Sequence, residues 1–218
     1  MRRLKKVACV LVTIIVLEIG LFLYVLNAPS ESSIPTQEPR PIVKDKPVIA
    51  YEYPPYYKQY DERWASVPYA NGTIETSGCG LCAAASYISF ATQSEITPAD
   101  LEAAVGSTCT VNGVNDMAIF LDYFEYYYGT THSDIFWTKD EAYARLDEGY
   151  LLFAGVEGQI GPNNYAGHVV LLWKQYGHIN VMDPASDNLG GLTDEEFYNA
   201  DFTYFYWMEG SSVVEFLN

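Results

Sequence analysis

Basic residues are scarce in this chain and unevenly placed. The 218 residues include 12 Lys and Arg against 28 Asp and Glu, for a formal net charge of −16. Because nucleic acid is bound by basic faces that neutralise phosphates, this balance excludes it as a partner. Four of the basic residues lie within the first six positions, so the rest of the chain is more acidic still. An acidic domain behind a basic tip is typical of secreted or membrane-tethered bacterial proteins.

Histidine and cysteine are also few, with three and four residues respectively. Their spacing does not match that of zinc ligands, so we expect no metal site, and nothing in the sequence implies an organic cofactor. His132 lies in a polar loop and is expected to be solvated, whereas His178 follows Gly177 at a turn and is expected at a strand edge. His168 differs from both, because a strongly apolar run follows it.

The N-terminal segment has the pattern of a signal-anchor. Residues 1–6 form a basic tip, and residues 7–26 are apolar apart from the single acid Glu18 and a few small or weakly polar residues. Twenty such residues match the length of a spanning helix, whereas the apolar core of a signal peptide is usually about 7–15 residues long. By the positive-inside rule we expect the tip in the cytoplasm and the rest of the chain outside the cell membrane, or secreted if this segment is cleaved.

A proline-rich segment separates this anchor from the globular domain. Residues 27–47 carry five prolines among Ser, Glu and Thr, which indicates an extended, semi-rigid linker. We expect the domain to occupy residues 48–218.

Within the domain, helical patterns come first and strand patterns later. Helices are expected after Cys79, over residues 97–105, 115–128 and 138–149, and for one turn at 193–198. Strands are expected at 150–156, 168–173, 178–182, 202–208 and 212–216. This order predicts an α+β fold in which N-terminal helices pack on a late antiparallel sheet.

A cysteine between two glycines marks the most distinctive stretch of the chain. Cys79 lies between Gly78 and Gly80, and the small-residue run after it predicts a helix that begins at the cysteine. The unpaired N–H groups of a helix start favour the thiolate, which is the nucleophilic form of the side chain. Cys79 is therefore a candidate nucleophile, although a small residue packing a helix end would give the same pattern.

A thiol nucleophile needs a base and a group that orients that base. His168 is expected at the start of a buried strand, about ninety residues after Cys79, where the scaffold can hold the ring. Asp183 is expected at the end of the next strand, and in a hairpin it would lie near His168 and accept the second ring N–H. An Asp before Pro also favours a turn on its own account.

Five short motifs together resemble the bacterial peptidase family C39-like domain, a relative of the papain-like leader peptidase domain of bacteriocin exporters. In chain order they are Gln59–Trp64, Val67–Tyr69, Ser77–Gly80, Gly167–Val170 and Asp183–Pro184. The resemblance implies a papain-like cysteine peptidase fold acting on a peptide or protein substrate. It implies Cys79 as nucleophile, His168 as base, Asp183 as its orienting group and Gln59 as a side-chain donor to the oxyanion hole. Leu81 and Cys82 replace the Pro-Thr usual in related sequences.

Two other functions fit parts of this pattern. Cys79 and Cys82 form a C-x-x-C motif, which is also found in thioredoxin-like oxidoreductases, but that fold has a strand directly before the motif and a βαβ order. A papain-like domain retained as a surface binding module is the second alternative, favoured by the many tyrosines. Such a module would have no need of Cys79, His168 and Asp183 together.

Overall fold

The computed structural model describes residues 39–42 and 48–209. The predicted basic tip (1–6), signal-anchor (7–26), most of the linker (27–47) and the strand expected at 212–216 lie outside these residues. In the part that is described, no helix is both long enough and apolar enough to cross a membrane.

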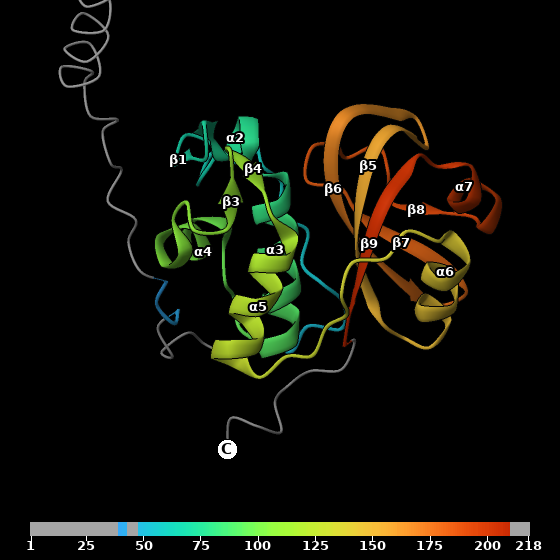
Figure 1. The fold of residues 1–218 in the computed structure, drawn as a ribbon, viewed down its shortest axis with the longest axis horizontal. Coiled ribbons are helices and arrows are strands. Elements are labelled where there is room, and N and C mark those ends of the chain that lie inside the picture. Colours follow the sequence, from blue (N-terminus) through green and yellow to red (C-terminus); the bar gives the residue numbers. More distant parts are fainter. Residues whose placement is uncertain (1–38, 43–47, 210–218) are drawn as a thin grey trace, which may run out of the picture. The chain divides into compact units, whose positions relative to one another are not determined.

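The described chain has an α+β architecture, with most helices before the main sheet (Figure 1). Its elements, in chain order, are β1 (Pro68–Tyr69), β2 (Gly72–Thr73), α2 (Ile74–Ser77), α3 (Cys79–Thr92), α4 (Pro98–Val105), β3 (Thr110–Val111), β4 (Val114–Asn115), α5 (Met117–Tyr128), α6 (Lys139–Asp147), β5 (Leu151–Ile160), β6 (Asn163–Gln175), β7 (His178–Met182), β8 (Gly191–Leu192), α7 (Asp194–Asn199) and β9 (Phe202–Met208). The order of helices and then antiparallel strands is the one predicted.

Local signals in the sequence set the helix boundaries. Thr97 caps α4, and its hydroxyl accepts a hydrogen bond from the Asp100 amide while the Asp100 carboxylate accepts one from the Thr97 amide. This reciprocal pair satisfies amide groups that the first turn of a helix leaves free. Helix α5 is capped by the Asp116 carboxylate and ends at Gly129, which has the left-handed conformation (φ 68°) that favours glycine.

Five antiparallel strands form the main sheet, in the order β8-β7-β6-β5-β9. Side chains alternate between its two faces, as successive residues of a strand must. Leu151 and Phe153 of β5 belong to the apolar cluster built with α3, α4 and α5, whereas Leu152 and Ala154 belong to a second cluster with α6 and α7. This part of the sheet is therefore buried on both faces, which explains why residues 151–156 of β5 are all apolar or Gly.

Strands β5 and β6 are longer than the sequence pattern predicts. The expected strands ended at Val156 and began again at His168, but β5 continues to Ile160 and β6 begins at Asn163. Most of the intervening residues are polar or Gly, and most of this part of the hairpin is exposed or half-buried. His168 therefore lies within β6 and not at the start of a strand.

Residues 39–42, which precede the expected start of the domain at Val48, already pack against it. Ile42 is buried, and its amide donates to the Tyr128 hydroxyl at 3.0 Å. The Arg40 carbonyl accepts from the Tyr123 hydroxyl at 2.7 Å, and the Pro39 carbonyl accepts from the Tyr127 hydroxyl at 2.7 Å. Residues 39–42 lie in the segment expected as a linker, so part of that segment contributes to the domain surface on α5.

Candidate active site

Cys79 is the first residue of α3 and is half-buried. Gly78 ends α2 and precedes α3, and a Cβ at Gly78 would lie 2.4 Å from the Ile74 carbonyl oxygen, so only glycine fits the junction. This tight turn between two helices places the thiol at the amide end of a fourteen-residue helix. The predicted location of Cys79 at the start of a helix is confirmed.

A bulge in the β5–β6 hairpin positions His168. Val156 pairs with His168 and Gly158 pairs with Tyr165, so two steps along β5 match three steps along β6. In a regular strand, residues three apart point to opposite faces. Here the extra residue on β6 lets the Tyr165 and His168 rings stack, with centroids 4.1 Å apart and planes 25° from parallel. The imidazole is buried and held flat against the tyrosine.

Asp183 directly follows β7 and is completely buried. Its Oδ1 atom lies 2.8 Å from His168 Nε2, and its Oδ2 atom accepts from the Tyr165 hydroxyl at 2.7 Å and the Asn163 amide at 3.2 Å. Burial alone would raise the pKa of this carboxyl, but the hydrogen bonds from His168, Tyr165 and the Ala185 amide outweigh it and lower the pKa. Asp183 is therefore a buried carboxylate whose charge is fully hydrogen-bonded.

These contacts fix the ring orientation of His168. An ionised carboxylate only accepts hydrogen bonds, so Nε2 carries a hydrogen and Nδ1 is left for another partner. The Cys79 side chain interacts with the imidazole and is the candidate partner for Nδ1. Burial would lower the pKa of His168, but the bonds to Asp183 and Cys79 outweigh it and raise the pKa to about 9. The structure thus brings together Cys79, His168 and Asp183, which lie far apart in the sequence.

Gln59 lies beside this group, between the two segments that carry Cys79 and Asp183. Its amide N–H donates to the Pro184 carbonyl at 2.9 Å, and its side-chain Nε2 donates to the Glu75 carbonyl. The side-chain Oε1 is buried and accepts no hydrogen bond from the described residues. One hydrogen of the Gln59 amide is therefore used by Glu75 in this structure, and the other is available.

Asn115, at the end of β4, contacts the thiol and was not identified from the sequence. Its Nδ2 lies 3.8 Å from Cys79 Sγ and donates to the Ser77 carbonyl at 2.9 Å. Its Oδ1 accepts from the Tyr69 hydroxyl at 2.7 Å, which fixes the amide with its N–H groups toward Cys79. An Asn just before a helix reads as part of the N-terminal cap, so the pattern contained no sign of this contact.

The close approach of Asn115 depends on Gly80. A Cβ at Gly80 would lie 2.6 Å from Asn115 Cβ and 3.0 Å from Met117 Sδ. We predict that Gly80→Ala lowers the free energy of unfolding by about 1–2 kcal/mol, because overpacking a buried contact outweighs the helix propensity gained by Ala. Urea denaturation measures the change. Gly190→Ala is the matched control, since nothing lies within 4 Å of its Cβ, and an equal effect at both positions would contradict the prediction.

Cys82, the second cysteine of the C-x-x-C motif, is completely buried and not disulfide-bonded to Cys79. Burial raises the pKa of its thiol well above the ordinary value. Cys109 is also buried, and burial raises its pKa to about 12. In the described residues helix α2, and not a strand, directly precedes the C-x-x-C motif, so the order of elements does not favour the oxidoreductase alternative.

Comparison with known proteins gives matches in fold only. No family model and no curated protein matches the sequence. One similar solved structure is a variant of the Salmonella effector SpvD, with 13% identity, 79% of this chain and 86% of that chain covered, and a TM-score of 0.36. Another is a crystal structure from Bacillus anthracis provisionally assigned as a C39-like peptidase, with 13% identity, 75% of this chain and 98% of that chain covered, and a TM-score of 0.48.

Proposed function

We propose that this chain is a papain-like cysteine peptidase that cleaves peptide bonds through an acyl-enzyme. The observation that carries the proposal is the chain of contacts from the Cys79 thiol through the His168 imidazole to the buried Asp183 carboxylate. It supplies a nucleophile, a proton carrier and an orienting group in one cluster.

In the first half of the reaction, the Cys79 thiolate attacks the carbonyl carbon of the scissile bond. The carbonyl π electrons move to oxygen, and the tetrahedral intermediate carries the resulting negative charge. When it collapses, the C–N bond breaks and His168 Nδ1–H gives its proton to the leaving amine. The products of this half are a free amine and a thioester on Cys79. Asp183 holds the ring through Nε2 and stabilises its positive charge before the proton is transferred.

In the second half, water replaces the amine. His168, now neutral, takes a proton from water while the oxygen attacks the thioester carbonyl. The C–S bond then breaks, releasing a carboxylic acid and restoring the thiolate and the imidazolium. Each proton that His168 gives in the first half is recovered in the second, so no other co-reactant than water is required.

Three groups are proposed as oxyanion donors. The amide N–H of Cys79 belongs to the free first turn of α3. Asn115 Nδ2 lies 3.8 Å from Sγ, a distance from which it can reach an oxygen on the carbon bound to sulfur. Gln59 has one side-chain N–H that Glu75 does not use, beside the turn that follows Asp183. Preorganised donors of this kind typically contribute about 10²–10³-fold each.

We further propose that the peptidase acts outside the cell membrane on a peptide or protein. This rests on the basic tip and the twenty mostly apolar residues at 7–26, which would tether residues 48–218 to the membrane. The net charge of −16 favours substrates that are cationic or neutral, because like charges repel.

Alkylation of the full-length protein tests the proposal. We predict that iodoacetamide modifies Cys79 at least about 10-fold faster than Cys82 or Cys109, whose burial and raised pKa keep them as unreactive thiols. Peptide mapping by mass spectrometry gives the three rates in one sample, so the buried cysteines are internal controls.

The same protein is then incubated with a pool of peptides in H₂¹⁸O. Hydrolysis through an acyl-enzyme introduces ¹⁸O into each new carboxyl terminus, and Cys79→Ala should abolish it. Peptide cleavage that persists in Cys79→Ala would overturn the proposal. Fast alkylation of Cys79 without any ¹⁸O incorporation would show a reactive thiol but no peptidase activity on the pool, and would contradict the peptidase part of the proposal.

A further inference from the structure

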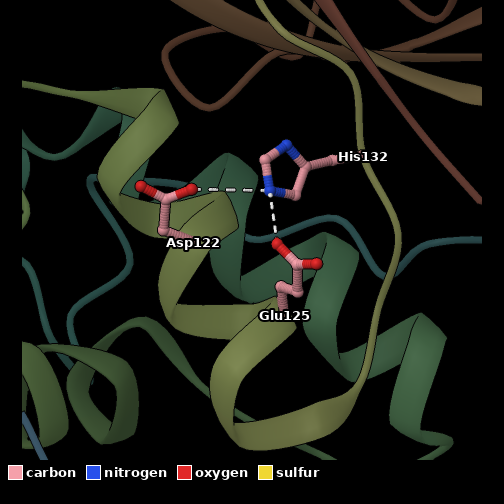
Figure 2. A group of neighbouring side chains, drawn as sticks. All are labelled: Asp122, Glu125 and His132. Atoms are coloured by element: carbon pink, nitrogen blue, oxygen red, sulfur yellow. Dashed lines mark ion pairs between the residues drawn. The ribbon is translucent and has the colours of Figure 1, made fainter.

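A second group of polar side chains lies on α5 and the loop that follows it (Figure 2). Asp122 and Glu125 are three residues apart on the helix, so their carboxylates project from the same face. His132 comes from the loop after Gly129 and points its ring toward both of them (Figure 2). The ligating atoms of the three residues all lie within 4.8 Å of one another.

His132 is held rigidly and is not the solvated loop residue expected from the sequence. Only 13% of its side chain is exposed. The loop is paired with the edge of the sheet, because His132 bridges to Met208, the Ser133 amide donates to the Trp207 carbonyl at 3.1 Å, and the Glu209 amide donates to the Thr131 carbonyl. The three residues thus join α5 to β9.

The contacts of the ring turn its Nε2 atom toward the two carboxylates. His132 Nδ1 lies 2.9 Å from the Ser133 carbonyl oxygen, which can only accept, so Nδ1 carries the hydrogen. With its hydrogen on Nδ1, the ring can bind a metal ion through Nε2. This nitrogen is shielded from solvent and has no hydrogen-bond partner in the described part of the chain. A backbone carbonyl that fixes the tautomer in this way is typical of metal-ligating histidines.

The distances between the three side chains fit the ligand spacing of a metal site. Nε2 lies 3.4 Å from Glu125 Oε2 and 3.6 Å from Asp122 Oδ1. A charge-assisted hydrogen bond would be about 2.7–2.9 Å. Ligands about 2.1 Å from a tetrahedral Zn²⁺ ion are separated by about 3.4 Å, which agrees with both distances.

We propose that Asp122, Glu125 and His132 form a binding site for a divalent transition-metal cation such as Zn²⁺. One nitrogen and two carboxylate oxygens suit this class of ion, whereas Ca²⁺ and Mg²⁺ take oxygen ligands. Both carboxylates are mostly exposed, with 73% and 64% of their side chains accessible, so the ion has a path from solvent and a fourth position for water. The bound ion would join α5 to the loop beside β9 and stabilise the domain.

Zinc binding to the full-length protein tests this site, with a chromophoric chelator as competitor and thermal unfolding as a second readout. We expect wild type to bind a Zn²⁺ ion whose affinity falls at least about 100-fold in His132→Ala and in the double variant Asp122→Asn with Glu125→Gln. Zn²⁺ should raise the Tm of wild type and leave the Tm of both variants unchanged. His178→Ala replaces an exposed histidine and should behave as wild type.

Two controls separate this site from the thiol and from misfolding. Cys79→Ala should retain the Zn²⁺ ion, because the proposed site does not include Cys79. The double variant replaces two exposed carboxylates with amides of the same size, so it should fold even if His132→Ala does not. Equal affinity in wild type and the double variant, or binding that is lost only in Cys79→Ala, would overturn the proposal. Neither result would bear on the peptidase activity.

Discussion

His168→Gln is expected to lower the rate of peptide hydrolysis by about 10²–10⁴-fold, the usual contribution of a positioned acid–base group. The imidazole is the group that contacts both the thiol and Asp183, so its loss removes the proton carrier for both halves of the reaction. ¹⁸O incorporation into the peptide pool measures turnover, and iodoacetamide alkylation of Cys79 at pH 6–7 measures thiol reactivity. Both rates should fall, because the thiolate then lacks its cationic partner.

Glutamine is preferred to alanine because of the buried carboxylate. Asp183 is completely buried, and removing its partner would leave an uncompensated charge that costs about 3–5 kcal/mol. The Gln side chain can still donate to Asp183 Oδ1, but it cannot take or give a proton in the reaction. His178→Ala is the matched control, since His178 is exposed at the start of β7. Turnover by His168→Gln within threefold of wild type would show that another group moves the proton.

Local signals in the sequence were sufficient for much of the fold. The Thr97 cap, the apolar spacing that ends at Gly129 and the helix after Cys79 each depend on neighbours within a few residues, and each helix is present. The length of the β5–β6 hairpin was underestimated because it depends on contacts between residues that are distant in the sequence. Its outer half is exposed and polar, so it carries no apolar alternation, and only pairing with the partner strand identifies it as sheet.

The residues of the candidate site differ in the same way, because some follow from local patterns and others only from tertiary packing. Cys79, His168 and Asp183 could be selected because cysteine and histidine are few in the chain and each of the three residues lies beside an apolar run or at a helix start. Tyr165 could not be selected, because three-residue spacing in a strand predicts opposite faces and only the bulge reverses this. The contact between Asn115 and the thiol depends on the packing of β4 against α3 across Gly80, which no local pattern encodes.

Asp183→Asn is expected to move the alkaline limb of the pH–rate profile to lower pH. In wild type, the hydrogen bonds to Asp183 and Cys79 outweigh burial and raise the pKa of His168 to about 9. Hydrolysis needs the protonated ring to give its proton to the leaving amine, so the rate should fall as the pH rises through about 9. Without the carboxylate charge, burial lowers the pKa and the limb should shift down by at least about one unit, which corresponds to a loss of rate of about twofold at pH 8 and about fivefold at pH 9.

The free energy of unfolding should also fall as the pH rises, because it depends on the same raised pKa of His168. A raised pKa means that the folded state binds the proton more tightly than the unfolded chain does. The stabilisation from His168 is therefore complete below its ordinary pKa of 6.5 and is lost as the pH rises through about 9. In Asp183→Asn this loss between pH 6.5 and 9 should be smaller, as measured by urea denaturation across that range.

Asp183→Asn removes the charge but keeps the shape of the side chain. The new amide oxygen can still accept from His168 Nε2, and the amide nitrogen can donate to the Tyr165 hydroxyl oxygen. The ring should thus keep its orientation while its pKa falls. Asp187→Asn is the matched control, since Asp187 is mostly exposed and pairs with Lys58 at 3.1 Å. If both variants keep the wild-type limb near pH 9, then Asp183 does not stabilise the charged form of His168, and its role is confined to holding the turn after β7.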